Sequence, residues 1–172
     1  SNLSSTRALA DITTKHGASY SASAVGEVNV VNMMKATNAV IGGEGNGGII
    51  LPELHYGRDA LVGIAIMLTH LANDGRTMSE LKASYPPYKI VKDRLQLTKE
   101  MDVDSILKAV ETKFKDERVN TIDGVKIDFK DGWVHLRKSN TEPIIRIYSE
   151  SKDIATATAL GLSVKNTVLE LI

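Results

Sequence analysis

Residues Arg137 to Pro143, followed by Arg146, hold the densest group of phosphate-binding residue types in the chain. The segment reads Arg-Lys-Ser-Asn-Thr-Glu-Pro. An Arg side chain offers a planar fork to two oxygens of a phosphate dianion, and hydroxyl and backbone N–H groups reach the remaining lone pairs. Pro143 fixes its own φ and biases Glu142 toward extended backbone, so the loop can be stiff before a ligand arrives. We predict these phosphate ligands: Arg137, Ser139, Asn140 and Thr141.

Two alternatives remain open for this loop. Ser, Asn, Thr and Pro are ordinary turn formers, so the segment could be only a turn whose Arg pairs with Glu142. Arg146 has two interpretations of similar weight: it could reach the phosphate, or it could pair with Glu142 or Glu150 across the sheet.

A second candidate site is the glycine-rich segment 42–48, in which five of seven residues are Gly. Such a backbone bends sharply or approaches a ligand closely. It lies between two apolar runs, 39–41 and 49–51, which predict buried strands. Its polar side chains, Glu44 and Asn46, could bind sugar hydroxyls, because a carboxylate accepts and an amide both donates and accepts. No Gly-Lys-Ser/Thr follows, so it is not a nucleotide phosphate loop. The alternative is a glycine-rich hairpin with a solvated Glu.

Both loops resemble signature loops of the α-D-phosphohexomutases, the phosphoglucomutase/phosphomannomutase family. Residues 137–143 resemble the R-x-S-x-T-E-P loop that grips the phosphate of a sugar phosphate in that family. Residues 43–48 resemble its G-E-x-S-G-H sugar loop, with Asn46 and Gly48 in place of Ser and His, as in archaeal-type sequences. Residues 24–31 resemble a further family segment, and the order of the loops along the chain also agrees.

The resemblance covers essentially the whole chain and implies part of the third family domain and the complete fourth. The family's phosphoserine loop and Asp-rich Mg²⁺ loop belong to the first two domains, and neither pattern occurs here. We therefore expect a C-terminal fragment without catalytic residues or metal ligands. The implied roles are sugar binding by Glu44 and Asn46, and phosphate binding by the loop 137–141 with Arg146.

The implied reaction interconverts hexose 1- and 6-phosphates through a phosphoserine, with Mg²⁺ and a hexose 1,6-bisphosphate intermediate. The implied partners are the hexose phosphate and the N-terminal domains of the same polypeptide. Three alternatives stay open: a phosphoglucosamine mutase, a non-catalytic phosphosugar-binding module, and a purely structural interaction domain. The sequence does not choose among glucose, mannose and glucosamine phosphates.

Charge and composition exclude several classes of protein. The 172 residues carry 21 Lys and Arg against 21 Asp and Glu, a formal net charge of zero. Nucleic acids and anionic membranes select for positive fields, so neither is expected as a partner. Cysteine is absent, which excludes a disulfide framework and thiol chemistry. No apolar run reaches membrane-spanning length, and a cytoplasmic location is the default expectation.

Helices and strands alternate in the first half, which favours an α/β domain with a mixed sheet. We predict a helix capped by Ser4 or Ser5, a short strand near Tyr20, a helix through 28–34, and a largely buried helix over 58–71, apolar on most sides. Thr77 and Glu80 have the spacing of a capping box that opens a short helix.

Pro86-Pro87 marks the expected boundary between domains 1–86 and 87–172. Beyond it the pattern is strand (88–97), helix (103–114), strands at 125–129, 133–137 and 145–148, and a final helix from Ile154. The expected fold class is therefore α/β followed by α+β, the second part being a mainly antiparallel sheet covered by two helices. Trp133 is expected in the core.

Overall fold

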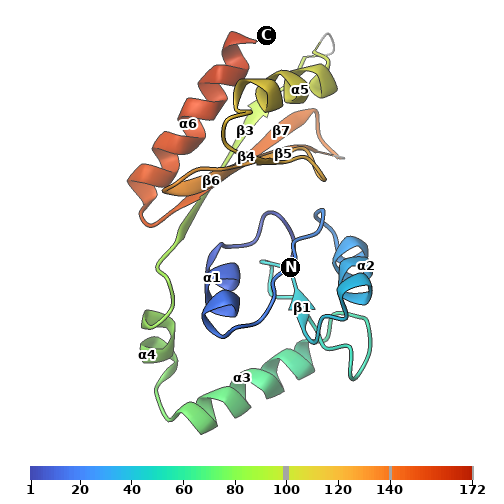
Figure 1. Ribbon diagram of the computed structural model, residues 1–172, viewed down its shortest axis with the longest axis vertical. Coiled ribbons are helices and arrows are strands. Elements are labelled where there is room, and N and C mark those ends of the chain that lie inside the picture. The colour runs from blue at the N-terminus through green and yellow to red at the C-terminus, as the bar shows by residue number, and fades with distance from the viewer. Residues whose placement is uncertain (99–100, 140, 172) are drawn as a thin grey trace. The chain divides into compact units, whose positions relative to one another are not determined.

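The computed structural model describes residues 1–98, 101–139 and 141–171. Close contacts divide the chain into two compact units, Ser1–Pro87 and Tyr88–Ile172. Each unit is described by itself (Figure 1). That domains 1–86 and 87–172 fold independently stays a prediction.

The second unit is a five-stranded antiparallel sheet with two helices on one face (Figure 1). The strand order is β3-β7-β6-β5-β4. The strands are β3 (Lys89–Gln96), β4 (Arg118–Asn120), β5 (Val125–Asp128), β6 (Gly132–Lys138) and β7 (Ile144–Ser151). The helices are α5 (Val103–Lys113) and α6 (Ile154–Glu170). This confirms the predicted α+β pattern; only the short edge strand β4 was not predicted.

The core of this unit lies between the helices and one face of the sheet. Period-2 alternation sends every second strand residue to that face, and α5 and α6 each contribute an apolar stripe. Both helices begin at an Asp cap: Asp102 accepts from the Ser105 backbone N–H at 3.4 Å, and Asp153 from that of Thr156 at 2.8 Å. The buried core residues are Leu95, Val103, Ile106, Leu107, Val110, Val125, Ile127, Val134, Leu136, Ile145, Ile147, Val164 and Val168.

The first unit alternates helices with short strands, and the fold class predicted for it is confirmed. It contains α1 (Ala8–Lys15), α2 (Glu27–Thr37), β1 (Gly42–Gly43), β2 (Ile49–Ile50), α3 (Ala60–Asp74) and α4 (Met78–Ala83). β1 and β2 pair antiparallel, and one isolated parallel bridge joins Asn2 to Ser23. The predicted capping box opens α4, because Thr77 and Glu80 each accept the other's backbone N–H.

Three local predictions in this unit were wrong. Neither Ser4 nor Ser5 caps α1; the Ala8 N–H donates instead to Thr6 Oγ1 at 3.2 Å. No strand forms near Tyr20, where the described backbone makes only the bridge at Ser23. Residues 39–41 do not form a buried strand: Val40 is 81% exposed, and the strand is confined to Gly42–Gly43. A short apolar run predicts a buried strand only where a neighbouring strand is present to pair with it.

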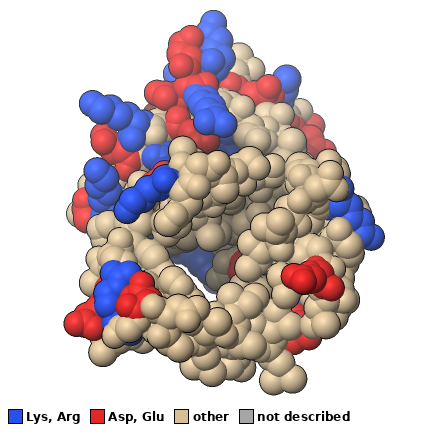
Figure 2. All heavy atoms as spheres, turned by 60° about the horizontal axis from the view of Figure 1, so that its bottom comes forward, with Lys and Arg blue, Asp and Glu red and all other residues tan. Residues whose placement is uncertain are grey.

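The prediction that the third helix is largely buried was also wrong. No side chain of α3 is buried, and Leu61, Ile64 and Leu68 are each more than half exposed. A helix can bury apolar sides only against other elements. Among the described residues, β2 packs against the side of α3 that carries Gly63. The contact is close, because a Cβ built on Gly63 would lie 3.0 Å from Ile49 Cγ1. Figure 2, in which all residues other than Lys, Arg, Asp and Glu are tan, shows a mainly tan surface at the bottom of the view, with charged groups at its left and right.

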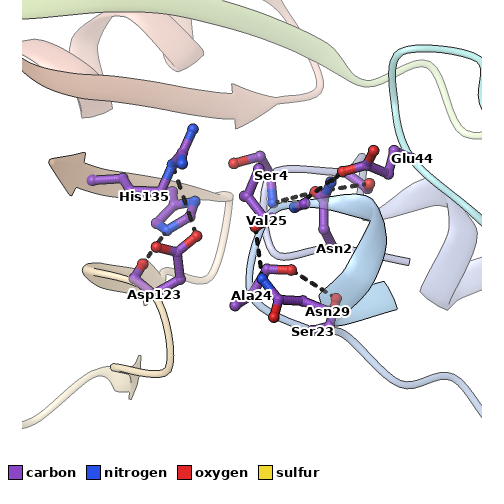
Figure 3. Close-up of polar contacts among 12 residues, drawn as sticks. Asn2, Ser4, Ser23, Ala24, Val25, Asn29, Glu44, Asp123 and His135 are labelled. Atoms are coloured by element: carbon purple, nitrogen blue, oxygen red, sulfur yellow. Dashed lines mark hydrogen bonds and ion pairs between the residues drawn. The ribbon is translucent and has the colours of Figure 1, made fainter. Parts of the chain in front are cut away.

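A turn between β4 and β5 is fixed against β6 by a buried histidine and a glycine. His135 is 2% exposed, and its Nε2 lies 2.7 Å from the backbone carbonyl oxygen of Asp123 (Figure 3). A carbonyl only accepts, so this contact places a ring proton on Nε2. Gly124 has φ +70°, and a Cβ there would lie 2.1 Å from the carbonyl oxygen of Leu136. The turn therefore requires glycine at this position.

We expect Gly124→Ala to destabilise the protein by about 2–4 kcal/mol, since it adds left-handed backbone strain to a steric clash with a strand carbonyl. Gly75→Ala is the matched control: its φ is +76° but nothing lies within 4 Å of the added carbon. That variant should lose only about 1–2 kcal/mol. Urea unfolding followed by circular dichroism measures the unfolding free energy of both variants. Equal losses would contradict the close contact between Gly124 and β6.

The buried ring of His135 should make stability depend on pH. Burial is the largest cause that lowers its pKa, Lys126 and Arg137 lower it further, and Asp123 opposes them. The neutral ring therefore contributes its full stability above about pH 6.5, the unfolded value. That contribution is lost as the pH falls further, by at most about 1.4 kcal/mol per pH unit.

His135→Gln should reduce the fall of the unfolding free energy between pH 7 and pH 5. His16→Gln, which replaces an exposed histidine, controls for the removal of an imidazole. An unchanged slope in His135→Gln would contradict the assignment.

Candidate functional site

The loop between β6 and β7 is held at both of its ends. The Ser139 N–H donates to the carbonyl of Ile144 at 3.0 Å, which closes the loop. The carbonyl of Pro143 accepts from the Leu97 N–H at 2.9 Å and from Gln96 Nε2 at 3.0 Å, which ties the loop to the end of β3. The predicted stiffness of this loop therefore has a structural basis beyond Pro143. The predicted ligand Asn140 lies outside the described residues.

Three arginines form a row on the face of the sheet that is turned away from the helices. Arg137 on β6 is directly paired with Arg146 on β7, and Arg146 with Arg94 on β3. Directly opposed residues of antiparallel strands have Cβ atoms about 4.5–5.5 Å apart, and like charges at that spacing repel. The row is thus a concentration of positive charge beside the loop.

Two carboxylates offset part of the positive charge of this row. Glu142 Oε2 lies 2.8 Å from Arg146 Nη2, and its Oε1 lies 3.9 Å from Arg94 Nη1. Asp123 Oδ2 lies 3.8 Å from Arg137 Nε. Arg146 Nη2 also donates to Ser139 Oγ at 3.3 Å. Of the two interpretations of Arg146, the structure therefore has the pair with Glu142, and in the same geometry the guanidinium reaches into the loop.

The hydroxyl groups of Ser139 and Thr141 lie side by side in the loop, and that of Ser139 contacts the Arg146 guanidinium. Ser139 is buried, with its Oγ 3.5 Å from Thr141 Oγ1. Glu150, the other acid considered as a partner for Arg146, instead accepts from Nε1 of the fully buried Trp133 at 2.7 Å. The structure thus links Arg146, Ser139 and Thr141 by side-chain contacts and places Arg137 opposite Arg146 on the neighbouring strand. Sequence reasoning missed Asp123 and Arg94, because both reach this row only through strand pairing; the Asp-Gly pair before β5 signalled a turn but not its neighbour.

The second predicted site is the turn between β1 and β2. The Glu44 N–H donates to the Gly48 carbonyl at 3.0 Å, and Gly47 takes φ +94° at the tip. Asn46 Oδ1 accepts from the Gly48 N–H at 3.1 Å, while its Nδ2 lies 3.4 Å from Glu44 Oε2. The two predicted sugar ligands therefore contact each other within one turn.

Glu44 is also tied to the body of its unit. Its Oε1 accepts from Asn2 Nδ2 at 2.8 Å and from the Gly26 N–H at 3.2 Å (Figure 3). These donors fix one carboxylate oxygen, so Glu44 is an oriented group and not the solvated side chain of the alternative interpretation.

An open hollow of about 630 Å³ adjoins this turn. Its walls include an ion pair in which Arg58 Nε lies 2.8 Å from Glu27 Oε2. Asp59 caps α3, whereas Arg58 lines the hollow. The lining residues are Glu27, Asn46, Gly47, Gly48, Arg58, Asp59 and Ala60.

Neither site contains a metal-binding arrangement. Among the described residues, no three His, Asp or Glu side chains gather as ligands for an ion. None of the described helices combines the length and the apolar character that a membrane span requires.

The chain matches two family models in succession. Residues 1–88 match phosphoglucomutase/phosphomannomutase, alpha/beta/alpha domain III. Residues 92–164 match the phosphoglucomutase/phosphomannomutase C-terminal domain.

Individual proteins similar to this chain bear names from the same family. A phosphoglucosamine/phosphogalactosamine mutase of Sulfurisphaera tokodaii is 40% identical over 146 residues, covering 84% of this chain and 32% of that protein. A phosphoglucomutase/phosphomannomutase of Thermococcus kodakarensis is 38% identical over 150 residues, again covering 84% of this chain and 32% of the relative. A crystal structure of a phosphoglucomutase/phosphomannomutase family protein from Burkholderia thailandensis has a TM-score of 0.76 at 26% identity, over 95% of this chain and 35% of that one.

The chain spans about a third of the length of these relatives. It belongs to the phosphoglucomutase/phosphomannomutase family and corresponds to the C-terminal part of that family's proteins.

Proposed function

We propose that this chain is the substrate-holding part of a phosphohexomutase, an enzyme that interconverts hexose 1- and 6-phosphates. The loop 137–141 with Arg146 would hold the phosphate that is not being transferred. Glu44 and Asn46 would hold ring hydroxyls. The main support is that Arg146 contacts the paired hydroxyls of Ser139 and Thr141, with Arg137 directly opposite Arg146, in a loop tied down at both ends.

A phosphate suits Arg146 better than its present partner Glu142 does. Arg146 and Glu142 are 32% and 46% exposed, and such a pair contributes only about 0–1 kcal/mol. A phosphate dianion brings a higher charge and three acceptor oxygens, and each well-formed hydrogen bond to it is worth about 1.5–3 kcal/mol. The ligand can therefore replace Glu142 as the partner of Arg146 at small cost.

The geometry at Glu44 supports its proposed role. With Oε1 held by Asn2 and Gly26, Oε2 is presented beside the Asn46 amide. A carboxylate and an amide at this spacing can bind vicinal hydroxyls, because together they offer both acceptors and donors. Fixed side chains of this kind orient a substrate without losing their own conformational entropy on binding.

The chemical step itself is assigned to other parts of the whole protein. Phosphoryl transfer depends on positioning and on neutralising charge at the transferred group. A serine nucleophile, Mg²⁺ and a hexose 1,6-bisphosphate intermediate belong to the proposed whole enzyme, and no residue of this chain is proposed to hold the metal. Binding the far phosphate and the ring would orient the reacting end.

Hexose phosphates and the N-terminal domains of the same polypeptide are the proposed partners, in the cytoplasm. Relatives named for phosphoglucosamine and for glucose and mannose phosphates are about equally similar. Amino-sugar phosphates are therefore candidate substrates beside the neutral hexose phosphates.

Titration of inorganic phosphate into the full chain, followed by amide NMR, tests the proposal. Binding should be weak, on the order of millimolar, and the shifts should centre on the loop 137–146. Arg137→Ala should abolish most of this binding. Arg137→Lys should recover only part of it, since a point charge cannot form a bidentate contact.

Glu44→Gln is the matched control, because it neutralises a carboxylate assigned to the sugar and should leave inorganic phosphate binding unchanged. Shifts that centre elsewhere, or binding that survives Arg137→Ala, would refute the proposed phosphate site.

A further inference from the structure

Arg137 has an ion-pair partner outside the loop, on a turn that is itself fixed in place. The carboxylate of Asp123 lies 3.8 Å from Arg137 Nε, and both side chains are only about one-fifth exposed, at 21% and 22%. Asp123 has no role in the function proposed above. We infer that Asp123 is a positioning residue, which holds the Arg137 guanidinium ready for the phosphate; this rests on the proposed function.

The backbone around Asp123 is restrained from two sides. His135 contacts the Asp123 carbonyl at 2.7 Å, and Gly124 lies so close to β6 that a Cβ would meet the carbonyl of Leu136. His135 and Arg137 alternate along β6 and so lie on the same face of the sheet. The strand that carries the arginine therefore also anchors the backbone of its partner.

The atom engaged by Asp123 makes this arrangement suitable for positioning. The nearest guanidinium atom is Nε, and a guanidinium carries four more N–H bonds on its two Nη atoms. Contact at Nε restricts the long side chain near its end. The two Nη groups then remain able to form a fork toward a phosphate.

Arg137 needs such a restraint because its neighbour across the sheet is Arg146. Repulsion between the two cations favours rotamers that separate them. The partner of Arg146, Glu142, belongs to the loop and is 46% exposed, so the ligand can displace it. Asp123 instead lies outside the loop on a fixed turn, so Arg137 keeps its partner while phosphate binds.

The test uses the full chain and inorganic phosphate, with two NMR readouts: the phosphate Kd and the side-chain Nε–H signal of Arg137. Asp123→Ala should raise the Kd by about 3- to 10-fold, the cost of ordering one long side chain on binding. It should also move the chemical shift of the Arg137 Nε–H toward the value of exposed, conformationally averaged arginines. A residue with a merely structural role would change the unfolding free energy and neither readout.

Asp123→Asn, the milder variant, keeps the shape of the side chain but removes its charge. It should raise the Kd by about twofold, and it decides the question if Asp123→Ala does not fold. Asp93→Ala is the matched control: it removes a carboxylate of the same unit, paired with Lys165 at 2.7 Å, and should change neither readout.

The inference is overturned if either Asp123 variant that folds binds phosphate as tightly as the wild type, or more tightly, while Arg137→Ala abolishes binding. That result would make Asp123 a competing negative charge. A wild type that binds no phosphate, or binding that survives Arg137→Ala, is a different result, and it refutes the proposed phosphate site instead.

Discussion

The antiparallel pairing of β6 with β7 is the constraint on which the candidate site depends. It sets Arg137 directly opposite Arg146, a repulsive arrangement unless anions lie nearby. A slip of β6 by one residue would turn its core residues Val134 and Leu136 to the other face of the sheet, so their burial fixes the register. The packing of Leu136, Ile145 and Ile147 against the helices thus holds two cations together, and Asp123, Glu142 and, as we propose, a substrate phosphate compensate them.

The two units contribute different kinds of binding group. The second provides positive charge and hydroxyl groups on a tethered loop, which suit a phosphate. The first provides an oriented carboxylate and an amide in a glycine-rich turn, which suit neutral hydroxyls. Glycine has a specific function at both places: Gly47 allows the positive φ at the tip of one turn, and Gly124 brings another turn against β6. Within each unit, these backbone restraints fix where the polar groups lie.

Much of the second unit could be predicted from the sequence, because period-2 strands and a 3.6-period helix stripe are local signals that its packing satisfies. The apolar helix over 58–71 shows where this reasoning fails: composition predicted burial, but burial depends on neighbours, and Leu61 is 78% exposed. The loop residues were identifiable because their types match phosphate chemistry. Asp123 was not, since its relation to Arg137 arises only when β5 and β6 pair. Asn46 was predicted from its loop, whereas the Glu27–Arg58 pair of the adjoining hollow required the folded chain.

A crystal structure of the chain with glucose 6-phosphate would show directly whether the loop between β6 and β7 binds phosphate. We expect the phosphate in this loop, within hydrogen-bond distance of the Arg137 guanidinium and the Ser139 and Thr141 hydroxyls. The carboxylate of Glu142 should then have moved away from Arg146, while Asp123 stays beside Arg137. A phosphate bound instead at Arg58 in the hollow of the first unit, with the loop vacant and Glu142 still paired to Arg146, would contradict it.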